Sequence, residues 1–394
     1  MEVRSGYKQT DLGVVPDDWH VCELDKVTQL QVGYAFKSEW FGRYGELRLL
    51  RGENVGYGSV DWSDTRTLDI SKRTEFSHYL LSSGDIIIGM DRTFTKSGVK
   101  ISRLTNKDIS SLLVQRVGRF IPTRCNADFL WHVLSFSRFH AALKLEQTGM
   151  DIPHLSRMEI LHPIIAVPPL PEQQAIADAL SDIDQLIASL DRLIAKKRDM
   201  KQASMQQLLT GKTRLKGFSG EWEMKRLGDI AHLYQPQTIG QSVFTSEGYP
   251  VYGANGIIGR YSRYNHTTRQ ITISCRGNCG TVNMTEPLSW ITGNAMVVNL
   301  DHTKSIDWDF AYHLLMFQDF SILVTGSGQP QIVRGPLKEF AIIVPKDVDE
   351  QVAISAVLSD MDTEIMELEK QRDKTTALKQ GMMQELLTGR TRLI

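Results

Sequence analysis

One long segment of this chain occurs twice. Residues 172–215 align without a gap on residues 350–393, and about half of the paired positions are identical, which chance would not produce over so long a stretch. Both copies begin with Glu-Gln and end on Leu-Leu-Thr-Gly-Lys/Arg-Thr-Arg-Leu. The chain therefore carries two copies of one structural unit.

Each copy reads as a long helix. Its apolar residues recur at alternating steps of four and three, the spacing of a coiled-coil seam, and a Thr-Gly pair follows as a C-terminal cap. Each helix is then roughly 35 residues, about 50 Å at 1.5 Å per residue. A lone stripe of this kind would indicate a buried bundle helix, but two equal helices favour pairing with each other, although Lys197, Lys201 and Arg372 interrupt the seam. The residues expected to pair the helices are Ile176, Leu180, Ile183, Ile187, Leu190, Ile194, Ile354, Leu358, Met361, Ile365 and Leu368.

The duplication extends into the regions before the helices. Residues 128–134 match residues 309–315 and predict a short helix in each region, and Trp19 followed by Leu24 matches Trp222 followed by Leu227. Strand-like runs lie at residues 85–90, 270–274 and 341–344. We therefore predict an α+β fold with an internal pseudo-twofold repeat, in which two globular regions alternate with two long antiparallel coiled-coil helices.

Composition restricts the class of protein further. No apolar run reaches membrane length and the first residues are not a signal peptide, so we expect a cytoplasmic protein without a membrane partner. The four cysteines are too scattered for a disulfide framework, and Cys275 with Cys279 lacks the second pair that structural zinc requires. We expect no metal site.

Charge is balanced overall but unevenly distributed. The formal net charge is -1, yet residues 248–285 contain no Asp or Glu, and residues 92–127 contain eight Lys and Arg against the single acid Asp108. Both windows mix arginine with amide or hydroxyl side chains, which suits phosphate neutralisation and the reading of base edges. A solvated positive face would explain one such window, whereas two corresponding windows favour double-stranded DNA as a partner.

A search for catalytic motifs finds none. The sequence has no Asp/Asn-Pro-Pro-Tyr/Phe tetrapeptide of an amino-group DNA methyltransferase and no phosphate-binding loop of an ATPase. Glu223 and Lys225 form the nearest string to a nuclease motif, and we interpret it as coincidental. His132 and His313 repeat in apolar helical surroundings, which is typical of core histidines. We predict no catalytic residue.

Three motifs carry a resemblance to a known family. The opening Gly6-Tyr7-Lys8 through Pro16 and Trp19, the Pro-Leu-Pro-Glu-Gln-Gln at residues 169–174 and the twin Leu-Leu-Thr-Gly endings resemble the specificity subunit of type I restriction-modification systems. The resemblance covers essentially the whole chain. Its duplicated helix separates the full-length subunit from half-length forms.

The resemblance implies a non-catalytic DNA reader. It implies target recognition domains at residues 19–165 and 216–343, a central conserved helix at 166–215, a C-terminal conserved helix at 344–394, and a lead-in at 1–18 that completes the repeat. The helices would dock two methyltransferase subunits, and restriction subunits would join the full complex. S-adenosylmethionine, ATP and Mg²⁺ would all bind to those partners, so this chain is expected to bind no cofactor.

The length of the helices also predicts the spacing between two DNA half-sites. If they hold two half-sites about 50 Å apart, the half-sites of an asymmetric, bipartite DNA sequence are separated by roughly 12 to 16 base pairs at 3.4 Å per base pair. The lead-in that precedes Trp222 in the second unit is found at the N-terminus for the first. We therefore expect the two chain ends to lie close together.

The residues expected to contact DNA are polar residues in loops of the two globular regions. They are Arg51, Asn54, Arg92, Thr93, Lys96, Arg116, Asp151 and His154 in the first region, and Asn255, Arg260, Arg263, Arg276, Asn278, Gln329, Gln331 and Arg334 in the second. The loop with Asp151 and His154 is matched to the loop with Gln329 and Gln331.

Two other functions stay open. A coiled-coil scaffold that joins two protein partners would need recognition surfaces without a basic bias. A nuclease that acts alone would need a metal-dependent activity that is abolished by changing Glu223 or Lys225.

Overall fold

The computed structural model describes residues 4–96, 98–146, 154–326 and 328–393. The chain divides into two compact units, unit 1 with residues 1–189 and 372–394 and unit 2 with residues 190–371. The long helices α4 (Leu170–Leu208) and α8 (Val348–Leu386) each contribute one part to unit 1 and the other part to unit 2. Each is 39 residues long, slightly longer than the sequence predicts.

Unit 1 is built on small sheets. Its four-stranded antiparallel sheet has the order β10-β7-β12-β4 (Ile101–Arg103, Ile86–Gly89, Val117–Pro122, Thr28–Val32). Its three-stranded sheet has the order β11-β5-β6 (Ser111–Leu113, Leu47–Leu50, Arg66–Leu68), with β11 parallel to β5. The two-stranded pairs are β3 with β13 (His20–Glu23, Ile164–Val167), β1 with β2 (Tyr7–Thr10, Gly13–Pro16) and β8 with β9 (Phe94–Thr95, Gly98–Val99). Its short helices are α1 (Ala127–Ser135), α2 (Ser137–Glu146) and α3 (Arg157–Leu161).

Unit 2 repeats this topology. Its four-stranded sheet has the order β15-β21-β18-β19 (His232–Tyr234, Ala295–Asn299, Ile271–Ser274, Val282–Met284). Its three-stranded sheet has the order β17-β16-β20 (Gly256–Tyr261, Tyr249–Gly253, Trp290–Ile291), with β16 parallel to β20. The pairs are β14 with β24 (Trp222–Arg226, Ala341–Pro345) and β22 with β23 (Val324–Thr325, Gln331–Ile332). The helices are α5 (Leu227–Ile230), α6 (Trp308–Phe317) and α7 (Arg334–Lys338).

The two topologies correspond strand by strand. Taken from its other edge, the four-stranded sheet of unit 2 has β19, β18, β21 and β15 where unit 1 has β10, β7, β12 and β4. The predicted runs at 85–90, 270–274 and 341–344 are the strands β7, β18 and β24, and the predicted short helices are α1 and α6. The α+β class and the internal repeat are confirmed.

The repeated glutamine explains why each short helix lies at the start of a long one. Gln173 accepts a hydrogen bond from the backbone of Asn126, at 2.8 Å, and donates to the carbonyl of Pro168, at 2.8 Å. Asn126 in turn caps α1 by accepting from two backbone N–H groups at its first turn. In unit 2, Gln351 makes the same pair of bonds with Asp307, the cap of α6, and with Pro345. Both glutamines are buried, so one side chain ties strand, cap and long helix together.

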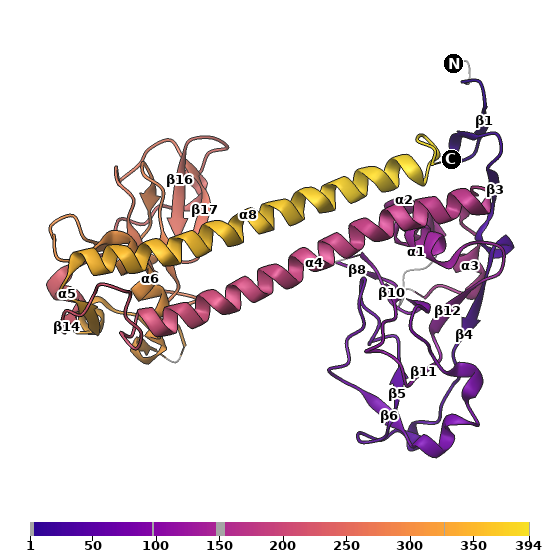
Figure 1. Ribbon diagram of the computed structural model, residues 1–394, viewed down its shortest axis with the longest axis horizontal. Helices are drawn as coiled ribbons and strands as arrows, with labels where there is room; N and C mark the ends of the chain where they lie inside the picture. The colour runs from indigo at the N-terminus through magenta and orange to yellow at the C-terminus, as the bar shows by residue number, and fades with distance from the viewer. Residues whose placement is uncertain (1–3, 97, 147–153, 327, 394) are drawn as a thin grey trace. The chain divides into compact units, whose positions relative to one another are not determined.

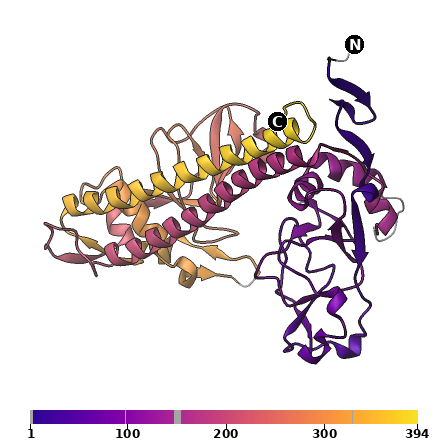
Figure 2. The same cartoon turned by 45° about the vertical axis from the view of Figure 1, so that its right-hand side comes forward.

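Apolar side chains of both long helices enter the core of each unit. In unit 1, Ile176 and Leu180 of α4 share a core with Met383 of α8 and Phe129 of α1. In unit 2, Ile354 and Leu358 of α8 share the corresponding core with α4 and with α6. Within unit 1, α1 and α2 lie along the first part of α4 in both views (Figure 1, Figure 2). These seam residues therefore pack against the globular part as well as against the other helix, which the seam pattern alone did not indicate.

The remaining seam residues are less uniform. Leu190, Ile194 and Ile365 are buried, while Ile183, Ile187, Met361 and Leu368 are only half-buried. Where the seam turns polar in unit 2, Lys197 of α4 pairs with Glu364 of α8 at 2.6 Å, and Lys201 pairs with Asp362 at 2.5 Å. In unit 1 the repeat-related pair is Lys379 with Asp184, at 2.6 Å. The two pairs of unit 2 run in opposite sequence directions along the helices, so the helix segments of that unit are antiparallel.

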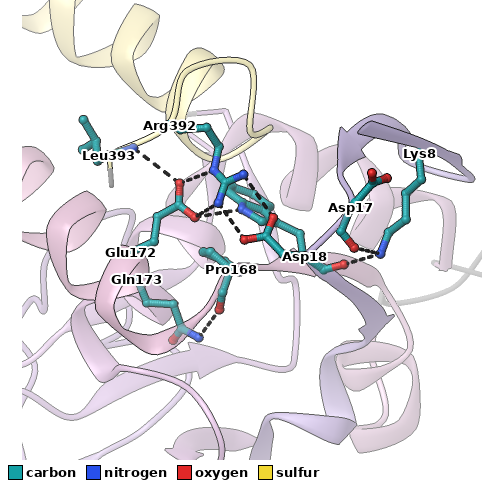
Figure 3. Close-up of polar contacts among 9 residues, drawn as sticks. Lys8, Asp17, Asp18, Pro168, Glu172, Gln173, Arg392 and Leu393 are labelled. Carbon is teal, nitrogen blue, oxygen red and sulfur yellow. Dashed lines mark hydrogen bonds and ion pairs between the residues drawn. The ribbon is translucent and has the colours of Figure 1, made fainter. Parts of the chain in front are cut away.

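The two chain ends meet in unit 1. Gly389 has a left-handed backbone (φ 72°), and a Cβ at this position would lie 2.4 Å from Pro16 Cδ, so only glycine fits the contact. Arg392 donates to both Asp18 carboxylate oxygens, at 3.0 and 2.8 Å, and to both oxygens of Glu172, at 2.6 and 2.8 Å (Figure 3). The expected proximity of the ends is confirmed.

We call this group the unit 1 clamp: Asp18, Trp19, Glu172 and Arg392. Trp19 and Glu172 are buried, and the indole N–H of Trp19 donates to Glu172 Oε2 at 3.0 Å. The hydrogen bonds from Arg392 hold the pKa of Asp18 below its usual value, and the bonds that Arg392 donates to Glu172 and Asp18 raise its own pKa. Lys8 adds bonds to the carbonyl oxygens of Asp17 and Trp19, both at 2.7 Å, so the lead-in is fixed at this point.

Candidate nucleic-acid interface

In unit 1, a turn follows β7. Thr93 is buried, and its hydroxyl donates to the carbonyls of Gly89 and Met90, at 2.8 and 3.0 Å, which closes the turn. Arg92 lies on this turn with a left-handed backbone (φ 47°), a conformation that side-chain-bearing residues rarely adopt. Arg92 and Lys96 are exposed, and their side chains make no hydrogen bond or ion pair within the described part of the chain. The turn therefore presents Arg92 as a free cation, and Lys96 adds a second one between β8 and β9.

A charged trio lies directly beside this turn. Asp91 accepts from Arg116 at 2.7 Å through one oxygen and contacts His154 Nδ1 at 2.7 Å through the other. Burial alone would raise the pKa of Asp91, but its bonds to Arg116 and His154 outweigh burial and hold that pKa below its usual value. Arg116 also has a left-handed backbone (φ 64°). The structure thus brings together Arg92, Arg116 and His154, which the sequence predicted from three separate places.

Arg51 and Asn54 form the neighbouring turn after β5. Asn54 is 2 % exposed and accepts from the backbone N–H of Arg51, at 3.1 Å, so its visible role is to shape the turn. Arg51 is paired with Glu53 and with Asp64. Lys100, which the prediction omitted, donates to the carbonyl of Gly52 at 3.1 Å and joins this turn to the end of β7. Asp151 lies outside the described residues.

In unit 2, the corresponding turn follows β18. Arg276 and Asn278 are exposed on it, and Arg276 forms a β-bridge with Gln331. Asn255 is exposed at the tip of the β16–β17 hairpin, and its neighbour Gly256 lies near Asn283 of β19. The predicted residues Asn255, Arg276, Asn278 and Gln331 therefore come from three segments that meet around β18 and β19.

Other predicted residues of unit 2 lie apart from that group. Arg260 is near the open end of the hairpin, where it pairs with Pro250 and donates to the carbonyl of Gly248 at 2.8 Å. Arg263 follows the end of β17, Gln329 precedes β23, and Arg334 begins α7; all three side chains are exposed. Contact with DNA stays a prediction for every residue of the set.

The sequence prediction missed two residues, Asn294 of unit 2 and Asp91 of the charged trio in unit 1. Met90 N donates to Arg116 O at 2.9 Å, and Cys275 N donates to Asn294 O at 2.9 Å, so Asn294 holds in unit 2 the position of Arg116. Asp91 lies at the centre of the trio and contacts both Arg116 and His154. Composition that favours cations gives no signal for the acid Asp91, and the sequence gives no signal that pairs Asn294 with Arg116.

The side chains that were considered for catalysis make contacts within the fold. His132 and His313 are buried, and their Nε2 atoms contact the hydroxyls of Ser181 and Ser359, at 3.3 and 3.1 Å. Burial lowers the pKa of His132 to about 4 and also lowers that of His313. Glu223 pairs with Lys225 at 3.0 Å. Among the described residues, no three His, Cys, Asp or Glu side chains gather as metal ligands, and no helix is long and apolar enough to cross a membrane.

Comparison with known proteins gives consistent matches. The family model for the type I restriction modification DNA specificity domain matches residues 16–196 and again residues 219–376. The MjaVIII specificity subunit of Methanocaldococcus jannaschii is 32% identical over 215 residues, 54% of this chain and 50% of that protein. The EcoAI specificity subunit of Escherichia coli is 32% identical over 49% of this chain and 32% of its own length. The matches thus span about half and about a third of these two relatives.

A third relative and a solved structure match over nearly the whole chain. The MjaX specificity subunit of M. jannaschii, described as putative, is 23% identical over 98% of this chain and 97% of that protein. The crystal structure of a type I S subunit from M. genitalium has a TM-score of 0.65 and 15% identity, and the match covers 98% of each chain. At this identity the structural match supports the fold alone.

Proposed function

Because the chain belongs to the type I restriction-modification DNA specificity family, we propose that it is the DNA-reading subunit of a type I restriction-modification complex. The observation that carries this proposal is the pair of equivalent polar turns after β7 and β18. Both stand on the same backbone framework, but their exposed side chains differ. Two copies of one framework with different side chains suit a DNA site whose two halves differ in sequence.

Each unit would read one half of a bipartite, asymmetric site. Arg92, Lys96 and Arg116 in unit 1 and Arg276 in unit 2 provide the cations that phosphates and base edges attract. The paired helices would set the distance between the half-sites, with a gap of roughly 12 to 16 base pairs if a helix of about 50 Å acts as the spacer.

The chemistry would belong to partner subunits. We propose that the long helices dock two methyltransferase subunits and that restriction subunits join the full complex. S-adenosylmethionine, ATP and Mg²⁺ would bind to those partners, and this chain would be non-catalytic. The buried, hydrogen-bonded state of both repeated histidines supports a structural role for them.

The test is to purify the tagged chain from its own host with the proteins that accompany it and to select bound duplexes from a random DNA pool. We expect a split, asymmetric motif with a fixed gap, enriched when a methyltransferase-sized partner is present. The absence of any enriched sequence, together with partners unrelated to DNA, would overturn the proposal in favour of a protein scaffold. Metal-dependent cleavage by the chain alone would favour a nuclease.

A further inference from the structure

A bridged pair of residues occupies the same place in both units. In unit 1, Leu155 N donates to Met90 O at 2.9 Å, and the next residues, Asp91 and His154, form an isolated antiparallel β-bridge. In unit 2, Ile332 N donates to Cys275 O at 3.0 Å, and Arg276 and Gln331 form the equivalent bridge. The backbone geometry is therefore repeated although no residue of the two pairs is the same.

The framework beneath each pair is rigid. Met90 and Leu155 are 4 % and 1 % exposed, and Cys275 and Ile332 are both 1 % exposed. Each buried residue directly adjoins one member of a pair, so the pair stands on core packing at the end of a sheet strand. Such a support fixes the backbone from which each side chain of a pair extends, and reading a base requires a rigid framework of this kind.

The chemistry of the pairs differs between the units. Arg276 and Gln331 are exposed, and neither side chain makes a hydrogen bond or ion pair within the part of unit 2 that the structure describes. A free guanidinium can donate two parallel hydrogen bonds to guanine O6 and N7, and a free carboxamide can bond to adenine N6 and N7. The unit 2 pair thus offers groups that recognise a purine in the major groove.

In unit 1 an acid takes the place of the arginine. Both oxygens of Asp91 are engaged, one by Arg116 and one by His154, at 2.7 Å each. Arg116 is 63% exposed and His154 is 47% exposed, so both keep polar atoms open to solvent. Asp91 is therefore a positioning residue, which fixes the direction of two polar side chains.

We propose that these equivalent pairs are specificity-determining positions, with Arg276 and Gln331 reading a purine in one half-site and Asp91 orienting Arg116 and His154 in the other. This inference rests on the proposed function. It predicts that each pair controls one position or two adjacent positions of its own half-site and none of the other.

The experiment compares motifs selected from a random DNA pool by the complex purified with its accompanying subunits. Arg276→Ala should lower discrimination at one position of one half-site by about 10- to 100-fold and leave the other half-site unchanged. Arg276→Lys should fail to restore discrimination, because lysine keeps the charge but lacks the planar fork. Asp91→Asn should relax the half-site that Arg276→Ala leaves intact.

Arg226→Ala is the matched control. Arg226 is an exposed arginine of unit 2 on β14, 63% exposed and paired with Glu339, and its loss should leave the motif unchanged. Hydrogen exchange of each variant checks that both units remain folded.

The outcomes separate the two proposals. A bipartite wild-type motif that Arg276→Ala leaves intact, or that Arg276→Lys fully restores, overturns the reading role and assigns Arg276 to a phosphate contact at most, while the proposed function stands. A wild-type complex that enriches no motif overturns both.

Discussion

Each unit contains a buried glutamate that is bound by an arginine, with a tryptophan in the same group, and the two units build this group from different parts of the chain. In unit 2, Arg214 and Trp222 lie on one continuous stretch of chain, and Arg214 binds both oxygens of the buried Glu350, at 2.5 and 2.6 Å. In unit 1, the corresponding Arg392 and Trp19 come from opposite ends of the chain, yet Arg392 binds the buried Glu172 through the same two nitrogens.

The group in unit 1 has more hydrogen bonds than the group in unit 2. Arg392 also binds Asp18, and the indole N–H of Trp19 donates to Glu172. In unit 2, the indole N–H of Trp222 is buried without a hydrogen-bond partner among the described residues, and Glu221 pairs with Lys346 at 2.8 Å. The comparison teaches that the group forms whether its arginine and tryptophan are near or far apart in the sequence, and that extra charged bonds accompany the version whose members are far apart.

The largest effect is expected from removing the arginines. Arg214→Ala and Arg392→Ala each leave a fully buried carboxylate without its main partner, which should lower the free energy of unfolding by about 3–5 kcal/mol. Arg214→Ala should be the more damaging, because Glu350 then loses both of its hydrogen bonds, whereas Glu172 keeps the bond from Trp19. Urea denaturation with hydrogen exchange assigned to each unit measures both.

Only Arg392→Ala should increase exchange in residues 4–19, because only Arg392 holds Asp18. Equal exchange in those residues for the two variants would contradict a clamp specific to the chain ends.

An intermediate effect is expected from the buried histidines at low pH. The pKa of His132 is lowered from 6.5 to about 4, so between these pH values the unfolded chain binds a proton that the folded chain does not. Stability should therefore fall as pH decreases through this window, by about 1.4 kcal/mol per pH unit for one proton. His132→Gln keeps a neutral hydrogen-bonding group and should reduce this loss, as measured by urea midpoints at pH 7 and pH 5.

His313→Gln tests whether a buried histidine causes the same loss of stability at low pH in unit 2. His313 has the same location and the same direction of pKa shift, so its replacement should reduce the acid loss in unit 2. If neither variant changes the pH dependence, other groups govern acid unfolding.

The smallest effect is expected from the ion pairs between the long helices. Lys201→Ala in unit 2 and Lys379→Ala in unit 1 should each cost about 1 kcal/mol or less, because these pairs remain partly exposed to solvent. The Lys201 side chain is 12% exposed and that of Lys379 is 19% exposed, so Lys201→Ala should cost slightly more. Double-mutant cycles with Asp362 and Asp184 at low and high salt measure each coupling, and a coupling that rises with salt would contradict this ion-pair account.

The sequence by itself determined the repeat, the long helices, their glycine caps and the short helices. These features depend on neighbouring residues, since a helical stripe or a cap is complete within a few turns of chain. It also proposed Arg92, Arg116, His154, Arg276 and Gln331 as candidate DNA contacts, because composition marks polar loops without reference to their neighbours in space.

Only the tertiary structure decided which of these residues meet. Asp91 lies 25 residues from Arg116 and 63 from His154, and Arg392 lies 374 from Asp18. Strand order, the parallel pairing of β5 with β11 and the equivalence of Asp91 with Arg276 were likewise unreadable from the sequence. Such contacts follow from how distant segments pack into a common core, and local sequence patterns do not encode that packing.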